Sequence, residues 1–332
     1  MKHSSFRTLG LTMGDPNGIG PEIMLKALSA LWPLKHWSPV IFGDRDVLAR
    51  VCQKLNLSLN FVDHQEYQPE DQRIPVVDLS VAENRQWQPG LMCAWGGESS
   101  YRFLMHAIQW CQDRKIDAIV TAPLCKEALH AAGHHFPGHT EMLSYYTNKA
   151  TPIMMLAVDQ FRAIHVTTHA PLKDAIASLT PDLIVETIRI GHDALVRMGI
   201  TQPRFGIPGL NPHAGENGLF GTEEQKIIIP AIEQARKLGM HCVGPISPDT
   251  IFLRHRDGEF DAVIALYHDQ AHIPLKLWGM DRGVNVTLGL PVIRTSVDHG
   301  TAFDKAPLFQ ADCGSMISAI ELALRLTGVD SV

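Results

Sequence analysis

The sequence predicts an α/β protein built on a mostly parallel sheet with helices on its faces. Short β-rich runs alternate with helical patterns, as where "TLGLTM" (8–13) precedes "PEIMLKALSAL" (21–31), and this alternation is typical of parallel sheets. Polar clusters recur directly after the predicted strands, where such sheets bind their ligands. The length of 332 residues fits two domains or one large domain.

The first part of the chain contains both kinds of element in turn. Pro21 stands in the first turn of its helix, where the missing N–H costs nothing, and residues 58–97 are the least regular segment. The predicted strands are 8–13, 39–44 and 117–123, and the predicted helices are 21–31, 45–55 and 99–115.

The second part continues the alternation. Thr180 is the predicted N-cap of a long amphipathic helix, and Gly199 is its predicted stop. The predicted strands are 152–158, 163–169, 204–210, 261–267 and 284–290, and the remaining predicted helices are 222–238 and 315–326.

Composition argues against several classes of protein. The net charge of −6 comes without a basic stripe, so nucleic acid is not an expected partner. No apolar run approaches the roughly 18 residues of a membrane span, and the N-terminus lacks the apolar stretch of a signal peptide. Six cysteines lie scattered without C-x-x-C spacing, so we expect reduced thiols in a cytoplasmic protein.

Three histidines share one setting, because His169 in "TTHAP", His213 in "NPHAG" and His268 in "YHDQ" each follow an apolar strand. Three imidazoles converging from strand ends suit a divalent ion with an open position. An ordinary loop histidine is the better interpretation of any single one, but the three together favour a site. His272 follows His268 at helical spacing, yet Pro274 argues against a regular helix through both. We therefore expect His268 to be the ligand and His272 a neighbour.

Two turns are candidate ligand sites. "GDPNGIGPE" (14–22) leads from a strand into a helix and would present backbone N–H groups to an anion, although it is not a Rossmann fingerprint. A tight turn that needs glycine explains it equally well. "PGHTE" offers His139 and Thr140 as hydrogen-bond donors near a helix start, where a plain N-cap is an equal alternative.

The densest stretch of polar groups is 275–304. Lys276 and Arg294 flank a predicted strand that contains Asn285, and these two cations could clamp a phosphate or carboxylate. A surface lysine and a turn asparagine are the alternatives. In "DHGTA" (298–302) the glycine would let the backbone approach a ligand closely.

Seven motifs occur along the chain in this order: "GDPNGIGPE", "PGHTE", "TTHAPL", "GLNPHAGENG…GTEE", "YHDQ", "RGVNVTLGLPVIRTSVDHGTA" and "DCGSMISAI". Together they resemble the 4-hydroxythreonine-4-phosphate dehydrogenase family of pyridoxal phosphate biosynthesis, from about residue 7 to 325. The first motif is also similar to the "GDGIGPE" turn, and "DHGTAFD" to the "HGSAPD" cofactor loop, of isopropylmalate and isocitrate dehydrogenases.

The resemblance implies roles for individual residues. It implies a divalent metal, zinc before magnesium, cobalt or manganese, on His169, His213 and His268. The substrate would contact His139, Thr140, Lys276, Asn285 and Arg294. NAD or NADP would lie along the loop with Asp298, His299, Gly300, Thr301 and Asp304.

The resemblance also implies the assembly. The fold would be two α/β/α domains with the active-site cleft between them, as in isopropylmalate dehydrogenase. Residues 1–127 and 297–332 would form the first domain, and residues 128–296 the second, with most metal and substrate residues. A homodimer is implied, in which the partner chain completes each active site.

The implied reaction is the oxidation of 4-phosphohydroxy-L-threonine by NAD(P) to a 3-keto acid, which loses CO₂ to give 3-amino-2-oxopropyl phosphate. Relatives that act on 4-phospho-D-threonate or 4-phospho-D-erythronate provide the alternative, and cis-dihydrodiol dehydrogenases a less favoured one. A zinc hydrolase would work without nicotinamide. A non-catalytic metal-binding module would not need Lys276 and Arg294 near the metal.

Overall fold

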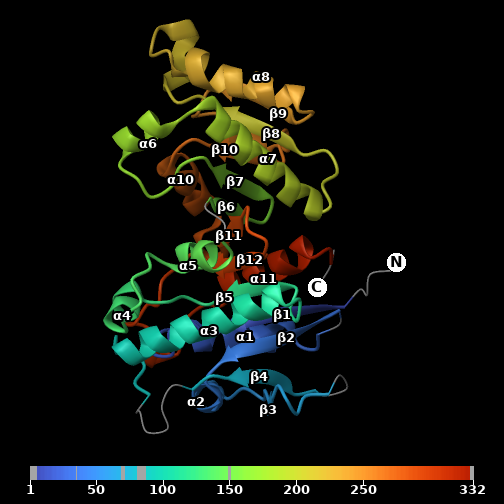
Figure 1. Ribbon diagram of the computed structural model, residues 1–332, viewed down its shortest axis with the longest axis vertical. Coiled ribbons are helices and arrows are strands. Elements are labelled where there is room, and N and C mark those ends of the chain that lie inside the picture. Colours follow the sequence, from blue (N-terminus) through green and yellow to red (C-terminus); the bar gives the residue numbers. More distant parts are fainter. Residues whose placement is uncertain (1–5, 35, 69–71, 81–86, 149–150, 330–332) are drawn as a thin grey trace. The chain divides into compact units, whose positions relative to one another are not determined.

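The computed structural model describes residues 6–34, 36–68, 72–80, 87–148 and 151–329 (Figure 1). The chain divides into two compact units, Met1–Pro152 with Leu290–Val332, and Ile153–Gly289. Each unit is an α/β structure with strands flanked by helices, as the alternating pattern predicts. No helix in the described ranges is both long enough and apolar enough to cross a membrane, and all six cysteines are free.

The division between the units differs from the one expected from the resemblance, which begins the second domain at residue 128. Two helices in 126–146 stay with the first unit because they pack against α3 (Ala94–Gln112). These helices are α4 (Lys126–Ala131) and α5 (His139–Tyr146). Residues 290–296 also belong to the first unit.

In the described part of the first unit, six parallel strands lie in the order β3-β4-β2-β1-β5-β12. The strands are β1 (Arg7–Thr12), β2 (Trp37–Gly43), β3 (Phe61–Asp63), β4 (Ile74–Asp78), β5 (Ala118–Thr121) and β12 (Arg294–Val297). The helices besides α3, α4 and α5 are α1 (Gly20–Leu31), α2 (Arg45–Leu55) and α11 (Gly314–Leu326), with a short turn η4 (Ala306–Leu308).

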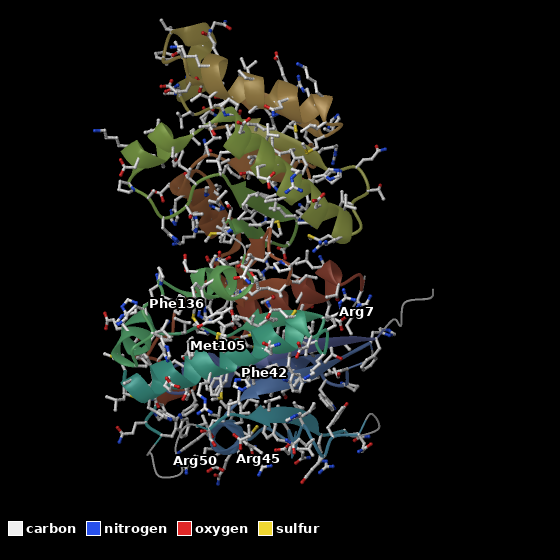
Figure 2. The ribbon with its side chains drawn as sticks, in the orientation of Figure 1. Arg7, Phe42, Arg45, Arg50, Met105 and Phe136 are labelled. Carbon is white, nitrogen blue, oxygen red and sulfur yellow. The ribbon has the colours of Figure 1, made fainter. Side chains whose placement is uncertain are left out.

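The helices of the first unit cover both faces of its sheet. The connection from β1 to β2 steps toward one edge and the connection from β4 to β5 toward the other, so right-handed crossovers put α1 and α3 on opposite faces. Phe42 of β2, labelled in Figure 2, is fully buried and meets Trp110 of α3 edge-on at a ring-centroid distance of 5.3 Å. This contact lies in the core between β2 and α3.

The second unit has a mixed sheet in the order β11-β6-β7-β10-β8-β9. Strands β7, β10, β8 and β9 run parallel, and β6 is antiparallel to both of its neighbours. The strands are β6 (Ile153–Val158), β7 (Phe161–His165), β8 (Arg204–Pro208), β9 (His241–Ile246), β10 (Ala262–Ala265) and β11 (Val284–Leu288). The helices are α6 (Leu172–Ser178), α7 (Pro181–Arg197), α8 (Ile229–Lys237), α9 (Ile251–Arg256) and α10 (His268–Gly279), with short turns η1 (Pro212–Gly218), η2 (Glu224–Ile228) and η3 (Met280–Arg282).

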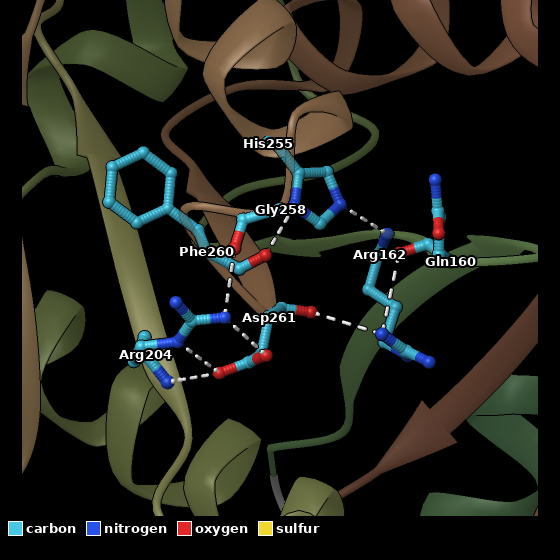
Figure 3. A network of polar contacts seen from close by, with 7 residues as sticks. All are labelled: Gln160, Arg162, Arg204, His255, Gly258, Phe260 and Asp261. Atoms are coloured by element: carbon cyan, nitrogen blue, oxygen red, sulfur yellow. Dashed lines mark hydrogen bonds and ion pairs between the residues drawn. The ribbon is translucent and has the colours of Figure 1, made fainter.

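A polar network braces the amino ends of β7, β8 and β10 (Figure 3). The Arg204 guanidinium donates to both carboxylate oxygens of Asp261 at 3.1 Å. His255 of α9 accepts from the Arg162 N–H at 3.0 Å, and its other ring nitrogen lies 2.9 Å from the Phe260 carbonyl oxygen. These contacts fix the amino ends of the three strands. The loops that carry the candidate histidines follow the carboxyl ends of the same strands.

Candidate functional site

The three histidines predicted to bind metal follow three neighbouring strands of the second unit. His169 comes after β7, His268 after β10 and His213 after β8, and β10 pairs in parallel with the other two strands. The carboxyl ends of parallel strands meet at one edge of a sheet, where α/β folds bind ligands. The sheet topology therefore brings the three loops to the same edge.

His169 and His268 lie together at this edge, with ring centroids 5.6 Å apart. Two imidazoles that share a tetrahedral zinc ion, with metal–nitrogen bonds of about 2.0–2.1 Å, have ring centroids about 5 Å apart. The two rings border a pocket of about 430 Å³ lined by residues 168–172, Ala175 and residues 267–269. The donor type and the spacing of this pair fit a shared divalent cation.

Asp269 prepares His268 for such a role. Its Oδ1 lies 2.6 Å from His268 Nδ1. A carboxylate only accepts hydrogen bonds, so His268 Nδ1 is the donor in this contact, and Nε2 is the ring nitrogen left to face a metal. Carboxylates orient metal-binding histidines in this way in many metalloproteins.

The expectation that Pro274 prevents a regular helix through His268 and His272 was wrong. Helix α10 begins at His268 and continues through Pro274 to Gly279. Proline removes one backbone N–H but has a φ close to that of a helix, so a single lost hydrogen bond does not end α10.

Two neutral histidines, His272 and His165, extend from His268 into the interior of the second unit. His272 stacks on it with ring centroids 3.6 Å apart. His272 Nδ1 lies 3.0 Å from the His268 carbonyl oxygen and 3.3 Å from His165 Nε2, and His165 Nδ1 lies 3.3 Å from the Met154 carbonyl oxygen. Carbonyl oxygens only accept, so both Nδ1 atoms carry protons and His165 Nε2 accepts. Burial, assisted by neighbouring histidines, lowers the pKa of His165 to about 3 and that of His272 to about 4.

His213 is exposed and lies in the turn η1. The Ser247 hydroxyl and, to a smaller extent, His213 lower the pKa of Asp249, so His213 lies near Asp249. Among the residues that the structure describes, no three His, Cys, Asp or Glu side chains are close enough to hold one metal ion. The described chain thus brings His169 and His268 together and does not bring His213 to them.

In the first unit, Arg294 forms a buried cationic position at the start of β12, where it is 3 % exposed. Its Nε and Nη2 donate to Thr121 Oγ1 at 3.1 and 2.7 Å. Burial lowers the pKa of Arg294 to about 9 against the opposing effect of Glu141, so the guanidinium stays charged at neutral pH. Burial, and then Arg294, hold the pKa of His139 well below its usual range. A buried guanidinium beside a hydroxyl and a neutral imidazole suits an anion.

The other predicted substrate residues are divided between the units. Thr140 is the second residue of α5, near the helix start as expected, and Gly138 occupies the cap position. Lys276 is exposed on α10, close enough to His272 to lower its pKa. Asn285 is half-buried on β11 opposite Leu156 of β6. His139, Thr140 and Arg294 therefore belong to the first unit, and Lys276 and Asn285 to the second.

The predicted cofactor loop follows β12 and rests on the "GDPNGIG" turn. The Ile19 N–H donates to the Thr301 carbonyl oxygen at 3.0 Å, and a Cβ on Gly18 would lie 3.0 Å from the same oxygen. A side chain at position 18 would therefore crowd this contact. Asp298 and Thr301 are half-buried, and His299, Gly300 and Asp304 are exposed. A Cβ on Gly300 would meet no atom within 4 Å, so a ligand can approach the backbone there.

Comparison with known proteins decides the family. Residues 35–323 match the family model described as pyridoxal phosphate biosynthetic protein PdxA. The chain belongs to the PdxA family. It is similar to the D-threonate 4-phosphate dehydrogenase of Cupriavidus necator, with 47% identity over 328 residues that cover 96% of this chain and 97% of that protein.

Two further relatives carry the other name in this family. The 4-hydroxythreonine-4-phosphate dehydrogenase of Beijerinckia indica subsp. indica is 42% identical over 320 residues, covering 96% of this chain and 94% of the relative. The crystal structure of 4-hydroxythreonine-4-phosphate dehydrogenase from Klebsiella pneumoniae matches with a TM-score of 0.86 and 40% identity, covering 97% and 99% of the two chains. The family resemblance, the α/β fold and the dehydrogenase class expected from the sequence are thereby confirmed.

Sequence reasoning assigned no individual site role to several residues of this PdxA-family chain. Asp269 and Gln270 stand within the quoted "YHDQ" motif, and that motif was the available signal. Thr121 ends β5, but a threonine in an apolar strand has no distinctive pattern. His165 is the last residue of β7 and is 1% exposed. Nothing in its sequence position indicates that it contacts His272.

Proposed function

We propose that this chain oxidises the 3-hydroxyl of a 4-phosphorylated four-carbon acid with NAD or NADP and a divalent metal ion. The observation that carries the proposal is the His169–His268 pair, whose ring-centroid distance of 5.6 Å fits a shared cation. The dehydrogenase names of the PdxA-family relatives support the reaction class.

Two substrates have support among the relatives. One is 4-phosphohydroxy-L-threonine, the substrate implied by the sequence motifs and by the name of the 42% identical relative. The other is 4-phospho-D-threonate, implied by the name of the 47% identical relative. The two acids differ at C2, where the first carries an amine and the second a hydroxyl, so one assay with both compounds separates them.

The residues of this chain would hold the substrate by its charges. Arg294, buried and cationic, would bind one anionic end with the Thr121 hydroxyl beside it. His139 stays neutral next to that cation, so it can donate or accept a hydrogen bond without adding charge. Lys276, Asn285 and Thr140 would complete the polar contacts.

The redox step needs groups that the chain would hold on its strand-end loops. His169, His213 and His268 would hold a divalent ion, zinc before magnesium, cobalt or manganese, and residues 298–304 would hold the nicotinamide cofactor. When bound, the ion supplies charge that lowers the pKa of a substrate hydroxyl and the nicotinamide accepts a hydride. Oxidation at C3 gives a β-keto acid, which loses CO₂ readily; from 4-phosphohydroxy-L-threonine the product is 3-amino-2-oxopropyl phosphate.

We further propose that the chain acts as a cytoplasmic homodimer in which the partner completes each site. Helix α10, which begins with His268, exposes two apolar side chains one turn apart, Ile273 at 59 % and Leu277 at 84 %. Burial of such a pair favours association. Light scattering should give twice the chain mass, and Leu277→Glu should shift the protein toward the monomer.

The test of the reaction is NADH formation from 4-phospho-D-threonate, 4-phosphohydroxy-L-threonine and 4-phospho-D-erythronate, with and without a chelator. We expect chelator-sensitive turnover of at least one acid, restored by added metal, and the preferred acid identifies the pathway. His268→Ala should lose turnover, while His192→Ala on α7 serves as the matched control. Parent-like turnover of His268→Ala, or turnover unaffected by chelation, would refute the metal assignment. Repeating the assay with NADP gives the cofactor preference.

A further inference from the structure

Residues 87–93 form a clasp on the "GDPNG" turn that follows β1. Trp87 Nε1 donates to the Pro16 carbonyl oxygen at 2.9 Å, and the Gly90 N–H donates to the Asn17 carbonyl oxygen at 2.8 Å. Both acceptors are backbone groups of the turn. The clasp and the turn, about 70 residues apart along the chain, are therefore bonded into one unit of structure.

Asn17 also holds the clasp with its side chain, which is buried with 1 % exposure. Its Oδ1 accepts from the Gln88 N–H at 3.2 Å, and its Nδ2 donates to the Leu91 carbonyl oxygen at 3.0 Å. Nδ2 also lies 3.4 Å from Cys93 Sγ. The Asn17 N–H donates to Asp15 Oδ1 at 2.9 Å, which fixes the backbone that carries the amide. Neither alanine nor an ionised aspartate can make both side-chain bonds to the clasp backbone.

The loop after β12 packs against the clasp. Gly90 has a φ of 92°, and a Cβ there would lie 2.8 Å from Pro307 Cγ and 2.9 Å from the Phe303 carbonyl oxygen. The rings of Trp87 and Phe309 have centroids 6.1 Å apart. The clasp is therefore part of the surface on which this loop rests.

The turn contacts the same loop nearer to Gly300, through the bond from the Ile19 N–H to the Thr301 carbonyl oxygen. Two segments of the chain thus support the loop, while a Cβ on Gly300 would still meet no atom within 4 Å. A loop that is ordered before its ligand arrives loses less conformational entropy on binding. The support of this loop should therefore raise its affinity for a ligand.

We propose that Asn17 is a positioning residue for the nicotinamide cofactor, because it fixes the clasp against the loop that would bind the cofactor. The inference rests on the proposed function, which assigns residues 298–304 to that cofactor. Asn17 does not need to touch the cofactor, since it acts through its bonds to the clasp backbone. The turn, the clasp and the loop all belong to the first unit.

The variants Asn17→Asp and Trp87→Phe test the proposal. Asn17→Asp places an oxygen in front of the Leu91 carbonyl oxygen, and Trp87→Phe removes the donor to Pro16 but keeps an aromatic ring. Trp87→Phe removes a single hydrogen bond, so it remains informative if Asn17→Asp fails to fold. The matched controls make the same exchanges at two exposed positions of the first unit, Asn60→Asp and Trp32→Phe.

The first measurement is backbone amide exchange in the cofactor-free, full-length protein. The amides of Gly90, Ile19 and Ala306 report on the clasp, on the contact of turn and loop, and on the loop itself, because each donates to a backbone oxygen. We expect all three to exchange about tenfold faster in both test variants, the factor that loss of one hydrogen bond of ordinary strength gives. Amides of β8, in the second unit, should be unchanged, and neither control should differ from the parent.

The second measurement is equilibrium binding of NADH and NADPH, followed by their fluorescence. The Kd of the preferred cofactor should rise about tenfold in both test variants, by the same loss of one bond. In steady-state assays the KM for that cofactor should rise by the same factor, while kcat and the KM for the phosphorylated acid stay within about twofold, as for loss of uniform binding. A general structural defect would lower kcat as well.

Faster exchange at Ile19 and Ala306 together with weaker cofactor binding supports the proposal. Parent-like exchange at these two amides overturns the coupling of clasp and loop, and faster exchange with a parent-like Kd overturns the positioning role. Gly300→Val tests the proposed function separately, because a side chain at this open position would block a ligand without meeting the protein. If that variant binds the cofactor like the parent, the loop is not the cofactor site and the role of Asn17 falls with it, whatever the exchange data show.

Discussion

Replacing Arg294 by methionine should make the ligand-free protein more stable and remove its activity. Burial lowers the pKa of Arg294 from the usual range of arginine to about 9. At about 1.4 kcal/mol per pKa unit, keeping this charge buried costs at most about 5 kcal/mol. The cost applies at any pH below 9, where both the folded and the unfolded arginine are charged. This figure already includes the attraction of Glu141, and the bonds to Thr121 offset part of it.

Methionine keeps much of the side-chain volume without the charge. Exchange of buried ions for apolar residues often stabilises proteins by about 1–4 kcal/mol, so we expect Arg294→Met to raise the free energy of unfolding by about 1–3 kcal/mol. The same change removes the buried partner of the substrate anion. Loss of such a partner typically costs about 2–5 kcal/mol, so kcat/KM should fall by at least about 30-fold.

Urea unfolding followed by circular dichroism measures the first effect, and NADH formation measures the second. Arg189→Met is the control, because this arginine is 50 % exposed on α7 and pairs with Glu186; exposed pairs contribute about 0–1 kcal/mol. If Arg294→Met unfolds more easily than the parent by 1 kcal/mol or more, the guanidinium is a net stabilising group and the reasoning is refuted.

Two substitutions and one NMR measurement test other features. Burial raises the pKa of Asp15 from 3.8 to about 6, so the stability that the protonated carboxyl contributes is full below pH 3.8 and is lost as the pH rises through 6. The loss in the free energy of unfolding is about 3 kcal/mol at most. Asp15→Asn should abolish this loss, which urea titrations at several pH values measure. Gly97→Ala should destabilise the first unit by several kcal/mol in thermal unfolding, because its Cβ would lie 1.9 Å from the Ala128 carbonyl oxygen. ¹⁵N NMR of the metal-free protein should find His165 and His272 with protonated Nδ1 and unprotonated Nε2 from about pH 6 to 8, and a cationic ring in that range would contradict the hydrogen-bond chain.

Elements with a strong periodic pattern and clear caps were predictable from the sequence. The helix expected at 45–55 is α2 (Arg45–Leu55), whose N-cap Asp44 accepts from the Val47 N–H at 3.1 Å. Thr180 caps α7 as predicted, accepting from the Leu183 N–H at 3.2 Å. Local chemistry is sufficient at these positions because the N-cap side chain accepts a hydrogen bond from a backbone N–H of the first turn, which has no partner within the helix.

Elements whose residues are determined by contacts with distant parts of the chain were not predictable. Helix α3 begins at Ala94, five residues before the predicted start at 99, because Gly96 and Gly97 hide the pattern. These glycines, poor helix formers, are needed because a Cβ at Gly96 would lie 2.5 Å from the Asp15 carboxylate and one at Gly97 would meet α4. The segment 58–97 looked irregular for a related reason, since β3 and β4 within it are short strands defined by pairing to each other and to β2.

The candidate site was predictable in kind but not in full. The sequence places polar groups after strands, and the topology then makes β7, β10 and β8 neighbours. Which side chains support those groups depends on contacts far apart along the chain, such as Gln270 with Gly209. A pattern that reports local periodicity contains no information on such contacts.

The features that are unfavourable for folding lie where ligands are expected. Arg294 buries a charge beside the last residue of β5, Asp15 buries a carboxylate just after β1, and residues 213–217 hold a left-handed backbone just after β8. Elsewhere local propensity and packing agree, as they do in α2 and α7. Natural proteins tend to break the rules of stability where function requires it. Asp15 and residues 213–217 follow the carboxyl ends of β1 and β8, and the Arg294 guanidinium donates to Thr121 at the carboxyl end of β5. Each unit therefore carries such violations at strand ends, on grounds independent of any motif.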